Sequence, residues 1–254
     1  MTSTGARPLV IDALTRRFGT LTAVNALSLE VRAGEIVGFL GANGAGKTTT
    51  LRCASGLLAP DQGRIEVAGA DLEREPRVAK ARLGLVPDRP FLYDKLSARE
   101  FLAFVAALYD LPADAAARRA EELLARLELA EHASRTLEGY SLGMRQKTAI
   151  AAALLHSPPL LLLDEPLNGL DPPSARLLKD LLREHARAGG GVLVSTHLLD
   201  VAERLCDRVV ILRAGRVVAE GTLASLRGDR HERSLEDVFM ELGGAPVPGD
   251  GSGT

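Results

Sequence analysis

The segment Gly41–Thr48, with the sequence GANGAGKT, limits the possible folds of this chain more than any other segment. It fits the pattern G-x-x-x-x-G-K-[ST] and lies between an apolar run, EIVGFLG, and a helical stretch, KTTTLRCASGLL. Glycines let backbone N–H groups curl around phosphate oxygens, Lys47 brings a positive charge to the β- and γ-phosphates, and Thr48 offers a hydroxyl to Mg²⁺. A chance match in a chain of this length has a probability of roughly a few per cent. The segment therefore predicts a phosphate-binding loop between a buried strand and the N-terminus of a helix.

Strand and helix patterns alternate along much of the chain. Near the N-terminus, LVIDALTRRF and LSLEVRAG predict a small β-layer with turns at Gly19 and Gly34. Further strands are predicted by EIVGFLG, GRIEVAG, RLGLVP, LLLLDEP and GVLVSTH, and a β-hairpin by RVVILRAGRVVAEG. Helical patterns separate several of these strands: KTTTLRCASGLL, PSARLLKDLLREHARAG and DVAERLC. The alternation predicts a parallel sheet made of βαβ units.

A long helical block interrupts this alternation between residues 90 and 156. Apolar residues recur at helical spacing at Phe101, Val105 and Leu108, and AAARRAEELLARLEL shows the same period. We therefore predict an α/β fold with a P-loop NTPase (RecA-like) core, a small antiparallel β-layer and an inserted helical subdomain.

The change from alternating strands and helices to a long helical block also predicts domain boundaries. One domain would span residues 8–226, with residues 8–88 and 158–226 forming the nucleotide-binding core and 89–157 the helical subdomain. A C-terminal helical extension would follow at 227–242. The Gly- and Pro-rich residues 243–254 would be disordered.

Composition excludes several classes of protein. The net charge of −2 gives no overall attraction to nucleic acid or anionic lipid, so we expect no nucleic-acid partner. The N-terminal MTSTGARP lacks the apolar region of a signal peptide, and no run of about 18 apolar residues predicts a membrane span. Cys53 and Cys206 have no metal-ligand spacing, which favours two buried thiols in a reducing compartment.

Acidic residues follow the apolar run LLLLDEP. Asp164 would lie at the carboxyl end of a buried strand, where ligands bind in open α/β sheets, and could hold Mg²⁺. Glu165 could orient or deprotonate the attacking water. His197 ends the strand VLVSTH at the same sheet edge, which favours a γ-phosphate contact. An acidic pair at a strand end is by itself more often a solvated cap, but the nearby phosphate loop favours the functional interpretation. The other histidines receive no role: His132, His156, His185 and His231.

The stretch YSLGMRQK, residues 140–147, precedes another helical run. A hydroxyl, a glycine N–H and a helix N-terminus together can meet a phosphate group. The alternative is an ordinary helix N-cap by Ser141. Both interpretations are compatible.

The motifs GANGAGKT, YSLGMRQK, LLLLDEP, NGLD and STH, in this order, resemble the ATP-binding-cassette (ABC) ATPases of membrane transporters. The resemblance covers about residues 8–220. The signature Leu-Ser-Gly-Gly-Gln of that family aligns with residues 140–144, where Ser141 and Gly143 are kept and the first glycine and the glutamine are not. The phosphate loop and the acidic pair then imply hydrolysis of ATP by water attack on the γ-phosphate, with Mg²⁺ as cofactor.

The resemblance assigns further roles. ATP would be bound by Phe18 and by the loop residues Gly41, Ala42, Asn43, Gly44, Ala45, Gly46, Lys47, Thr48 and Thr49. Phe18 would stack on adenine, although a core aromatic is the alternative. Asp88, in VPDRP, stands where many relatives have a glutamine that reaches Mg²⁺ and water. It could bind Mg²⁺ as a carboxylate or only cap a turn.

The resemblance also implies a second ATPase subunit, identical or different, in a head-to-tail dimer with two sandwiched ATP molecules. The signature residues Ser141, Leu142, Gly143 and Met144 would contact the ATP of that partner, and Asp171 would lie at the dimer seam. The segments PDRPFLYDKLSAREFL and SLEDVFMEL resemble ABC-2-type exporter ATPases, close to the Ecs-like group. Residues 88–102 would then lie beside an integral-membrane permease at the cytoplasmic face of the membrane. Three apolar residues of this segment would form the dock or the subdomain core: Phe91, Leu92 and Tyr93.

Two other classes of function stay open at the level of the sequence. A soluble cassette ATPase outside transport is disfavoured by the single cassette, the lack of a coiled-coil insertion and the lack of a Cys-rich motif. A regulatory nucleotide-binding module without turnover is disfavoured by Asp164, Glu165 and His197. Asp88 and Met144 leave that possibility open.

Overall fold

The structure is a computed structural model that describes residues 6–227 and 234–244. Its strands are β1 (Leu9–Phe18), β2 (Leu21–Val31), β3 (Ile36–Leu40), β4 (Gln62–Val67), β5 (Ala70–Asp71), β6 (Leu83–Val86), β7 (Leu160–Asp164), β8 (Gly191–Thr196), β9 (Arg208–Arg213) and β10 (Arg216–Gly221). Its helices are α1 (Lys47–Ala54), α2 (Pro76–Ala81), α3 (Ala98–Leu108), α4 (Ala113–Arg126), α5 (Leu142–Leu154), α6 (Pro172–Arg187), α7 (Leu199–Leu205), α8 (Leu223–Arg227) and α9 (Leu235–Gly244), with short 3₁₀ turns at Ala130–His132 and Leu137–Gly139.

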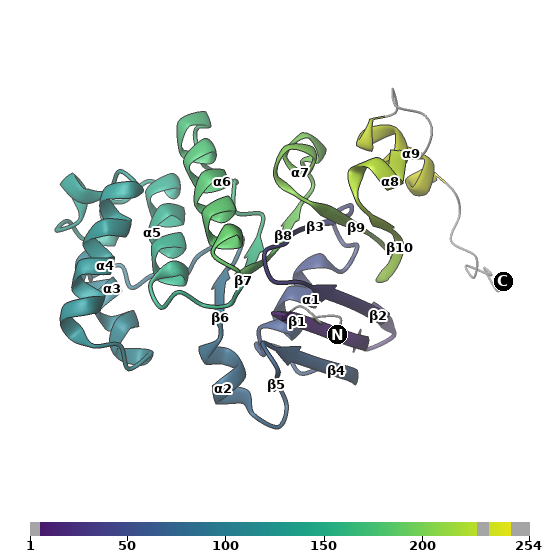
Figure 1. The fold of residues 1–254 in the computed structure, drawn as a ribbon, viewed down its shortest axis with the longest axis horizontal. Coiled ribbons are helices and arrows are strands. Elements are labelled where there is room, and N and C mark those ends of the chain that lie inside the picture. Colours follow the sequence, from purple (N-terminus) through teal and green to yellow (C-terminus); the bar gives the residue numbers. More distant parts are fainter. Residues whose placement is uncertain (1–5, 228–233, 245–254) are drawn as a thin grey trace, which may run out of the picture.

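Two sheets form the centre of the molecule (Figure 1). The six-stranded sheet has the order β10-β9-β3-β8-β7-β6, and the strands from β9 to β6 pair in parallel. The four-stranded sheet has the order β2-β1-β4-β5 and is antiparallel. The predicted α/β fold with a parallel core and an antiparallel β-layer is therefore confirmed. The sequence patterns did not reveal β5 and α2, because both are too short to show a clear period.

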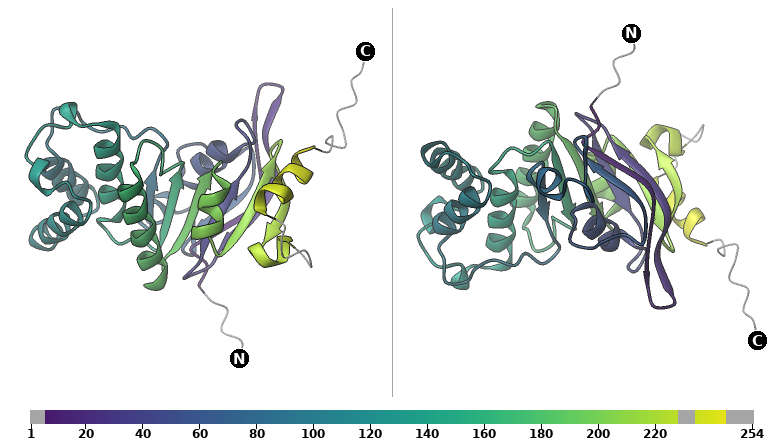
Figure 2. Two further views of the ribbon diagram at one scale, coloured as in Figure 1. Left: turned by 90° about the horizontal axis from the view of Figure 1, so that it is seen from above. Right: turned by 90° about the horizontal axis from the view of Figure 1, so that it is seen from below.

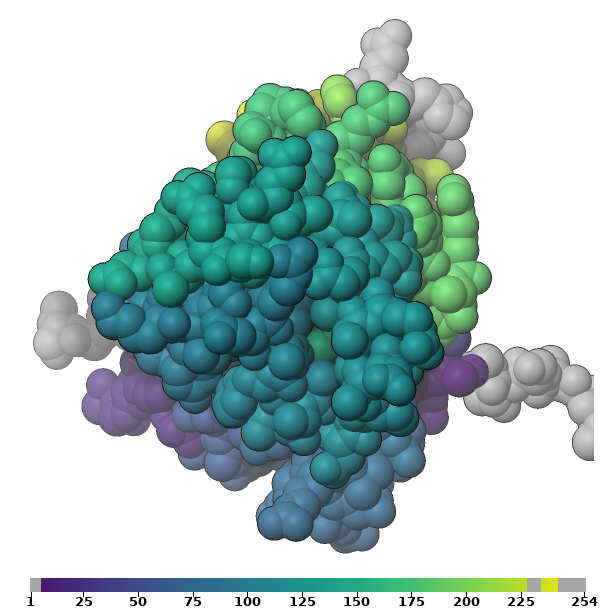
Figure 3. All heavy atoms as spheres, turned by 90° about the vertical axis from the view of Figure 1, so that its left-hand side faces the viewer, coloured from purple at the N-terminus to yellow at the C-terminus, as the bar shows by residue number. Residues whose placement is uncertain are grey.

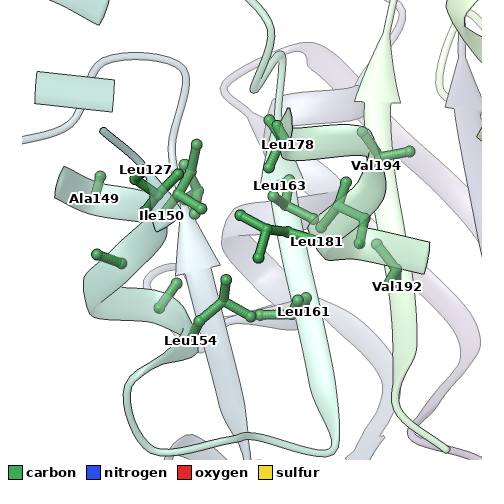
Figure 4. Close-up of a cluster of buried hydrophobic side chains, with 14 of the residues drawn as sticks. Leu127, Ala149, Ile150, Leu154, Leu161, Leu163, Leu178, Leu181, Val192 and Val194 are labelled. Atoms are coloured by element: carbon green, nitrogen blue, oxygen red, sulfur yellow. The ribbon is translucent and has the colours of Figure 1, made fainter. Parts of the chain in front are cut away.

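Buried side chains cover both faces of the six-stranded sheet. In β7, Leu161 and Leu163 pack with α5 and α6, while Leu160 and Leu162 pack on the side of α1 and the β-layer. This explains the unbroken apolar run LLLLD, because a strand buried on both faces does not alternate with polar residues. Figure 4 shows Ile150 of α5 and Leu181 of α6 reaching toward the first of these faces. Each such buried side chain contributes about 1.5–3 kcal/mol, which holds the strand ends in fixed positions.

The helices α3, α4 and α5 pack against one another and form a helical unit at one end of the molecule (Figure 1). Its teal residues make up most of the face in Figure 3. Ser97 begins α3 with a capping box, in which its hydroxyl accepts from the Glu100 N–H and the Glu100 carboxylate accepts from the Ser97 N–H. Contact of α5 with β6 joins this unit to the six-stranded sheet.

The two alternatives left open for residues 91–93 divide between them. Phe91 and Tyr93 are exposed, whereas Leu92 is only 3% exposed and belongs to the hydrophobic core. Leu92 lies in a loop without periodicity, so its sequence neighbourhood gave no sign of the direction of its side chain.

The C-terminal part packs on α7. Glu203 of α7 accepts hydrogen bonds from Arg227 and from the Leu235 N–H, and so ties α8 and the start of α9 to the core. Residues 245–254, most of the tail for which disorder was predicted, lie outside the described residues.

Cys53 and Cys206 are buried free thiols, as predicted, and burial raises the pKa of Cys53 to about 11. None of the helices in the described ranges combines the length and hydrophobicity needed to cross a bilayer.

Candidate active site

A cleft of about 780 Å³ lies where the phosphate loop, the carboxyl ends of β7 and β8 and the β1–β2 hairpin meet. This is the edge at which parallel α/β sheets bind ligands. The residues that line it are Phe18, Leu21, Thr22, Ala23, Ala42, Asn43, Gly44, Gly46, Lys47, Thr48, Thr49, Asp88, Asp164, Glu165, Asn168, His197, Ala214 and Gly215. The structure thus gathers twelve of the residues named from the sequence into one cleft. Gly41 and Ala45 do not line it.

The glycines of the loop are required by its backbone and by its neighbours. Gly46 has φ = 107°, and a Cβ at this position would lie 2.4 Å from the Ala23 carbonyl oxygen. At Gly41 a Cβ would lie 2.6 Å from the Leu212 carbonyl oxygen. The helix α1 that follows has no side-chain cap, so its first N–H groups are directed at the cleft without a side-chain partner of their own. The loop is therefore shaped to hold an anion.

Lys47 lies at the base of the cleft and is only 6% exposed. Its ammonium donates to the carbonyl oxygens of Gly41 at 2.6 Å and of Ala42 at 3.2 Å. An ammonium has three N–H donors, so one remains for a phosphate oxygen. Burial lowers the pKa of Lys47, and the nearby carboxylates of Glu165 and Asp164 oppose that change by favouring the charged form.

Asp164 ends β7 and is 4% exposed. One of its carboxylate oxygens accepts a hydrogen bond from the Ser195 hydroxyl of β8. The two residues are direct partners in the parallel register. The sequence analysis did not name Ser195, although its place one residue before the end of the strand VLVST could have suggested it.

Glu165 follows with φ = 47°, in the left-handed region that non-glycine residues rarely adopt. Such a conformation costs on the order of 1–3 kcal/mol and is enriched at functional sites. Two hydrogen bonds hold it, because the Glu165 N–H is shared between the Ser195 carbonyl at 3.1 Å and its hydroxyl at 3.2 Å. The carboxylate then lies 3.0 Å from His197 Nδ1. The backbone turn thus aims the carboxylate into the cleft beside the imidazole.

Asp88 and Asn168 meet across the cleft, where the Asn168 amide donates to an Asp88 carboxylate oxygen at 3.0 Å. The motif NGLD contains Asn168 but does not by itself predict a role for it. The two residues are separated by 80 positions, so no local pattern connects them.

Phe18 is 48% exposed and lines the cleft, so the alternative that it is a core aromatic is wrong. It pairs with Leu21 across the tight turn between β1 and β2. Leu21, Thr22 and Ala23 join it on the same wall and were not named from the sequence.

The start of α5 lies outside this cleft. Ser141 caps the helix, since its hydroxyl accepts from the Met144 N–H at 3.2 Å, and Leu142 is 59% exposed. Gly143 lies against the NGLD loop, where a Cβ would be 2.9 Å from the Gly169 carbonyl oxygen. Of the residues named as a signature, Ser141, Leu142, Gly143 and Met144, none lines the cleft formed by the described residues.

Asp171 caps the next helix, α6, by accepting from the Ser174 N–H at 2.8 Å. Hydrogen bonds from Ser174 lower the pKa of this carboxyl group. The NGLD loop therefore connects Glu165 in the cleft with the start of α5 and the start of α6.

Comparisons with known proteins show what this chain is similar to. The family model described as ABC transporter matches residues 24–168. The daunorubicin resistance ATP-binding protein DrrA3 of Streptomyces coeruleorubidus is 40% identical over 235 residues, which are 92% of this chain and 74% of that protein. The ABC-type transporter ATP-binding protein EcsA of Bacillus subtilis is 35% identical, over 92% of this chain and 96% of its own. A solved structure of the ATP-binding subunit of an ABC transporter superposes with a TM-score of 0.88 at 36% identity, covering 92% of this chain and 99% of that one.

Proposed function

The chain belongs to the ATP-binding subunits of ABC transporters, which bind and hydrolyse ATP, and from this premise we propose that it powers an exporter through a separate membrane permease. The observation that carries the proposal is the single cleft in which Lys47, Asp164 and the Glu165–His197 pair meet. Such a site binds a nucleoside triphosphate by its phosphates and places a base beside them. The similarity to a daunorubicin resistance protein supports export, because removal of a compound from the cell explains resistance.

ATP would lie with its phosphates on the loop 41–49 and its adenine at Phe18. The loop N–H groups and the third donor of Lys47 would meet the β- and γ-phosphate oxygens. The exposed ring of Phe18 offers a flat apolar surface on the hairpin wall. A nucleotide base stacks on such a ring because every base has a π-face.

Glu165 would act as the base of the reaction. A water molecule attacks the γ-phosphorus, its proton passes to the Glu165 carboxylate, and ADP leaves with the former bridging oxygen. With its Nδ1–H donated to Glu165, His197 would orient that carboxylate and turn its other ring nitrogen toward the γ-phosphate. The left-handed backbone of Glu165 supports this role, since a strained turn is kept where it aims a functional group.

The donors present fit Mg²⁺. Thr48 offers a hydroxyl, and Asp164 and Asp88 offer carboxylate oxygens, in the same cleft. Bound there with the ATP phosphates, Mg²⁺ supplies positive charge to the β- and γ-oxygens. Among the residues that the structure describes, no group of three or more acidic, His or Cys side chains gathers around a point. The protein would therefore supply at most two carboxylate ligands beside the Thr48 hydroxyl, and the nucleotide and water would supply the others.

Subunits of this family dimerise and pair with membrane permease components. We infer that the start of α5 contacts the ATP of a second, identical or different, ATPase subunit. The capped, outward-facing Ser141 and the exposed Leu142 lie away from their own cleft and support this inference. Asp171 would lie at the seam, because the NGLD loop touches the start of α5 through Gly169.

The permease would dock on the segment that follows Asp88. Phe91 is 84% exposed and Tyr93 49%, and the two rings lie edge to face with centroids 6.0 Å apart. Exposed aromatic pairs mark interaction surfaces more often than plain surface. The chain would then sit at the cytoplasmic face of the cell membrane.

The decisive experiment isolates the tagged chain from the membranes of its own host in a mild detergent. We expect a protein with several apolar spans to co-purify together with ATPase activity. Phe91→Glu should release that protein, while Leu108→Glu, a change of an exposed apolar residue elsewhere on the helical unit, should not. Recovery of all ATPase activity from the soluble fraction, without any membrane protein, would contradict the transport role and leave the soluble class of ATPase.

A further inference from the structure

Phe18 is not the only side chain that shapes the hairpin wall of the cleft. The guanidinium carbon of Arg16 lies 4.9 Å from the centroid of the Phe18 ring. This is within the range of a cation–π contact, in which the positive charge sits over the negative face of the ring. One face of Phe18 is therefore covered by Arg16. The ring is nevertheless 48% exposed and lines the cleft, so its uncovered surface is directed to the ligand side.

Asp61 fixes Arg16 from the loop that precedes β4. Its carboxylate accepts from Arg16 Nη1 at 2.9 Å and from the Arg17 backbone N–H at 2.6 Å. The Asp61 N–H in turn donates to the Thr15 carbonyl oxygen at 2.9 Å. A single aspartate thus holds three consecutive residues of β1, and the next residue is Phe18.

The end of β1 requires such a clamp because its pairing with β2 is irregular. The register of the two strands shifts between Leu14 and Arg16 and again between Arg16 and Arg17. A ladder with these shifts does not by itself define the direction of the next side chain. The contacts of Asp61 define it instead, through the backbone at Arg17 and through the guanidinium at Arg16.

We propose that Arg16 and Asp61 are positioning residues for the nucleotide base: together they hold the Phe18 ring in the orientation in which adenine stacks on its uncovered face. This inference rests on the proposed function, since it takes ATP as the ligand of the cleft. Ordering a side chain on binding lowers affinity, so a ring that is already held binds more tightly. The benefit expected from pre-ordering one aromatic ring is roughly 2- to 10-fold in affinity. Neither residue touches the phosphates or the reacting atoms in this arrangement.

The test compares ATP with inorganic tripolyphosphate, which has the phosphates but no base. Arg16→Ala should raise KM for ATP by roughly 2- to 10-fold and leave kcat unchanged. The inhibition constant of tripolyphosphate should stay at the wild-type value. Arg16→Lys, which keeps the charge without the flat guanidinium, should recover part of the loss, and Asp61→Asn should act in the same direction as Arg16→Ala.

Two further variants make the result specific. Arg17→Ala is the matched control, because Arg17 meets Asp61 through its backbone N–H and not through its guanidinium. It should behave as the wild type. In a Phe18→Ala background, Arg16→Ala should cause no further rise in KM, since a positioning residue acts only through the ring that it positions.

Several outcomes would overturn the inference. Equal losses for ATP and tripolyphosphate would mean that Arg16 acts on the phosphates or on the fold as a whole. Additive effects of Arg16→Ala and Phe18→Ala would mean that Arg16 does not act through the ring. An unchanged KM in Arg16→Ala, with a raised KM in Phe18→Ala, would refute the inference and leave the proposed function intact. An unchanged KM in Phe18→Ala would show that adenine does not stack on this ring. A wild type without ATPase activity would refute the proposed function.

Discussion

Two helix N-termini in this molecule carry glycine motifs, and they are prepared for a phosphate in different ways. The helix α1 begins at Lys47 after Gly46, has no side-chain cap and faces its own cleft. The helix α5 begins at Leu142 after Ser141, whose hydroxyl already accepts from the Met144 N–H, and it lies outside that cleft. Figure 1 shows α1 between the six-stranded sheet and the antiparallel β-layer, and α5 between α6 and the rest of the helical unit.

The N-terminus of α1 forms a complete anion site within one chain, whereas the N-terminus of α5 would form half of a site shared with a partner subunit. At α1, the backbone leaves its first N–H groups for the ligand, so binding requires no rearrangement of a cap. At α5, Ser141 satisfies one N–H in the isolated chain and contributes to helix stability. A phosphate from a partner subunit would share that N-terminus with the cap. We therefore expect changes in the phosphate loop and at Lys47 to affect ATP binding by the monomer, and changes at the start of α5 to affect turnover alone.

The largest effect is expected for Glu165→Gln. This variant tests whether, in the cleft at α1, different residues are responsible for ATP binding and for turnover. Glutamine keeps the size of the side chain but cannot accept the proton of water. A catalytic base contributes about 10²–10⁴-fold to a rate, so kcat should fall by that factor while ATP affinity stays unchanged. Steady-state turnover and equilibrium binding of ATP measure the two quantities. Normal turnover in this variant would show that another group is the base.

Lys47→Ala should weaken binding itself. Hydrogen bonds that involve a charged group contribute about 1.5–3 kcal/mol, so the ATP affinity of the monomer should fall by roughly 10- to 100-fold. Binding titration at a protein concentration that keeps the chain monomeric measures this. The matched control is Lys179→Ala on α6, which removes a cation that does not line the cleft. Wild-type affinity in Lys47→Ala would contradict the idea that the α1 site is complete within one chain.

Ser141→Asp tests the α5 side. Aspartate is as good an N-cap as serine, so the free energy of unfolding should not decrease. Its negative charge would oppose a partner's phosphate, and we expect turnover to fall about 10-fold or more while ATP binding by the monomer is unchanged. Chemical denaturation and ATPase assays measure the two effects. Normal turnover in Ser141→Asp would make Ser141 a cap and nothing more.

The smallest effect concerns the other end of α5. His156 follows this helix, its ring stacks on Tyr109 at 3.8 Å, and its Nε2 donates to the Leu83 carbonyl oxygen at 3.1 Å. Its buried Nδ1 has no hydrogen-bond partner within the described part of the chain, and burial lowers the pKa of this imidazole. In the folded state the His156 imidazole therefore stays neutral at a pH at which the same imidazole in the unfolded state, with its ordinary pKa of about 6.5, binds a proton.

The sign of the pH dependence of the free energy of unfolding follows from this lowered pKa. Above pH 6.5 both states are neutral at this position and the folded state carries no penalty. As the pH falls below that value, the unfolded state gains protons and the free energy of unfolding decreases. His156→Gln should reduce this dependence between pH 7 and pH 5, and His185, whose pKa burial also lowers, should account for part of what remains. Denaturation curves across this range measure it, and an unchanged slope in His156→Gln would refute the assignment.

Local patterns predicted much of the fold because its main elements depend on neighbours in sequence. The run LLLLD predicts a buried strand, and the structure confirms it as β7, buried on both faces. The sequence pattern did not predict α2 and β5, because these elements are too short to show a period. The sequence left open whether Leu92 is exposed or buried, since the direction of a loop side chain depends on what packs over it.

The candidate site likewise contains features that the local sequence determines and contacts that only packing creates. The positive φ of Gly44 and Gly46 is a local demand of a tight loop, so the spacing of glycines reveals that loop directly. Contacts such as Asn168 with Asp88 and Asp61 with Arg16 join residues that are 80 and 45 positions apart. No local pattern contains such pairs, because they exist only after the sheets have packed.

The sequence by itself determined that a phosphate loop lies between a buried strand and a helix, and that an acidic pair ends another buried strand, because backbone conformation and burial follow from residue type and spacing. The tertiary structure alone decided that Phe18 is half exposed under Arg16, that Ser195 holds Asp164 and Glu165, and that the start of α5 does not line the cleft of its own chain. The physical reason is that a hydrogen bond or ring contact between distant residues requires both partners to be fixed by packing, and packing is a property of the whole chain.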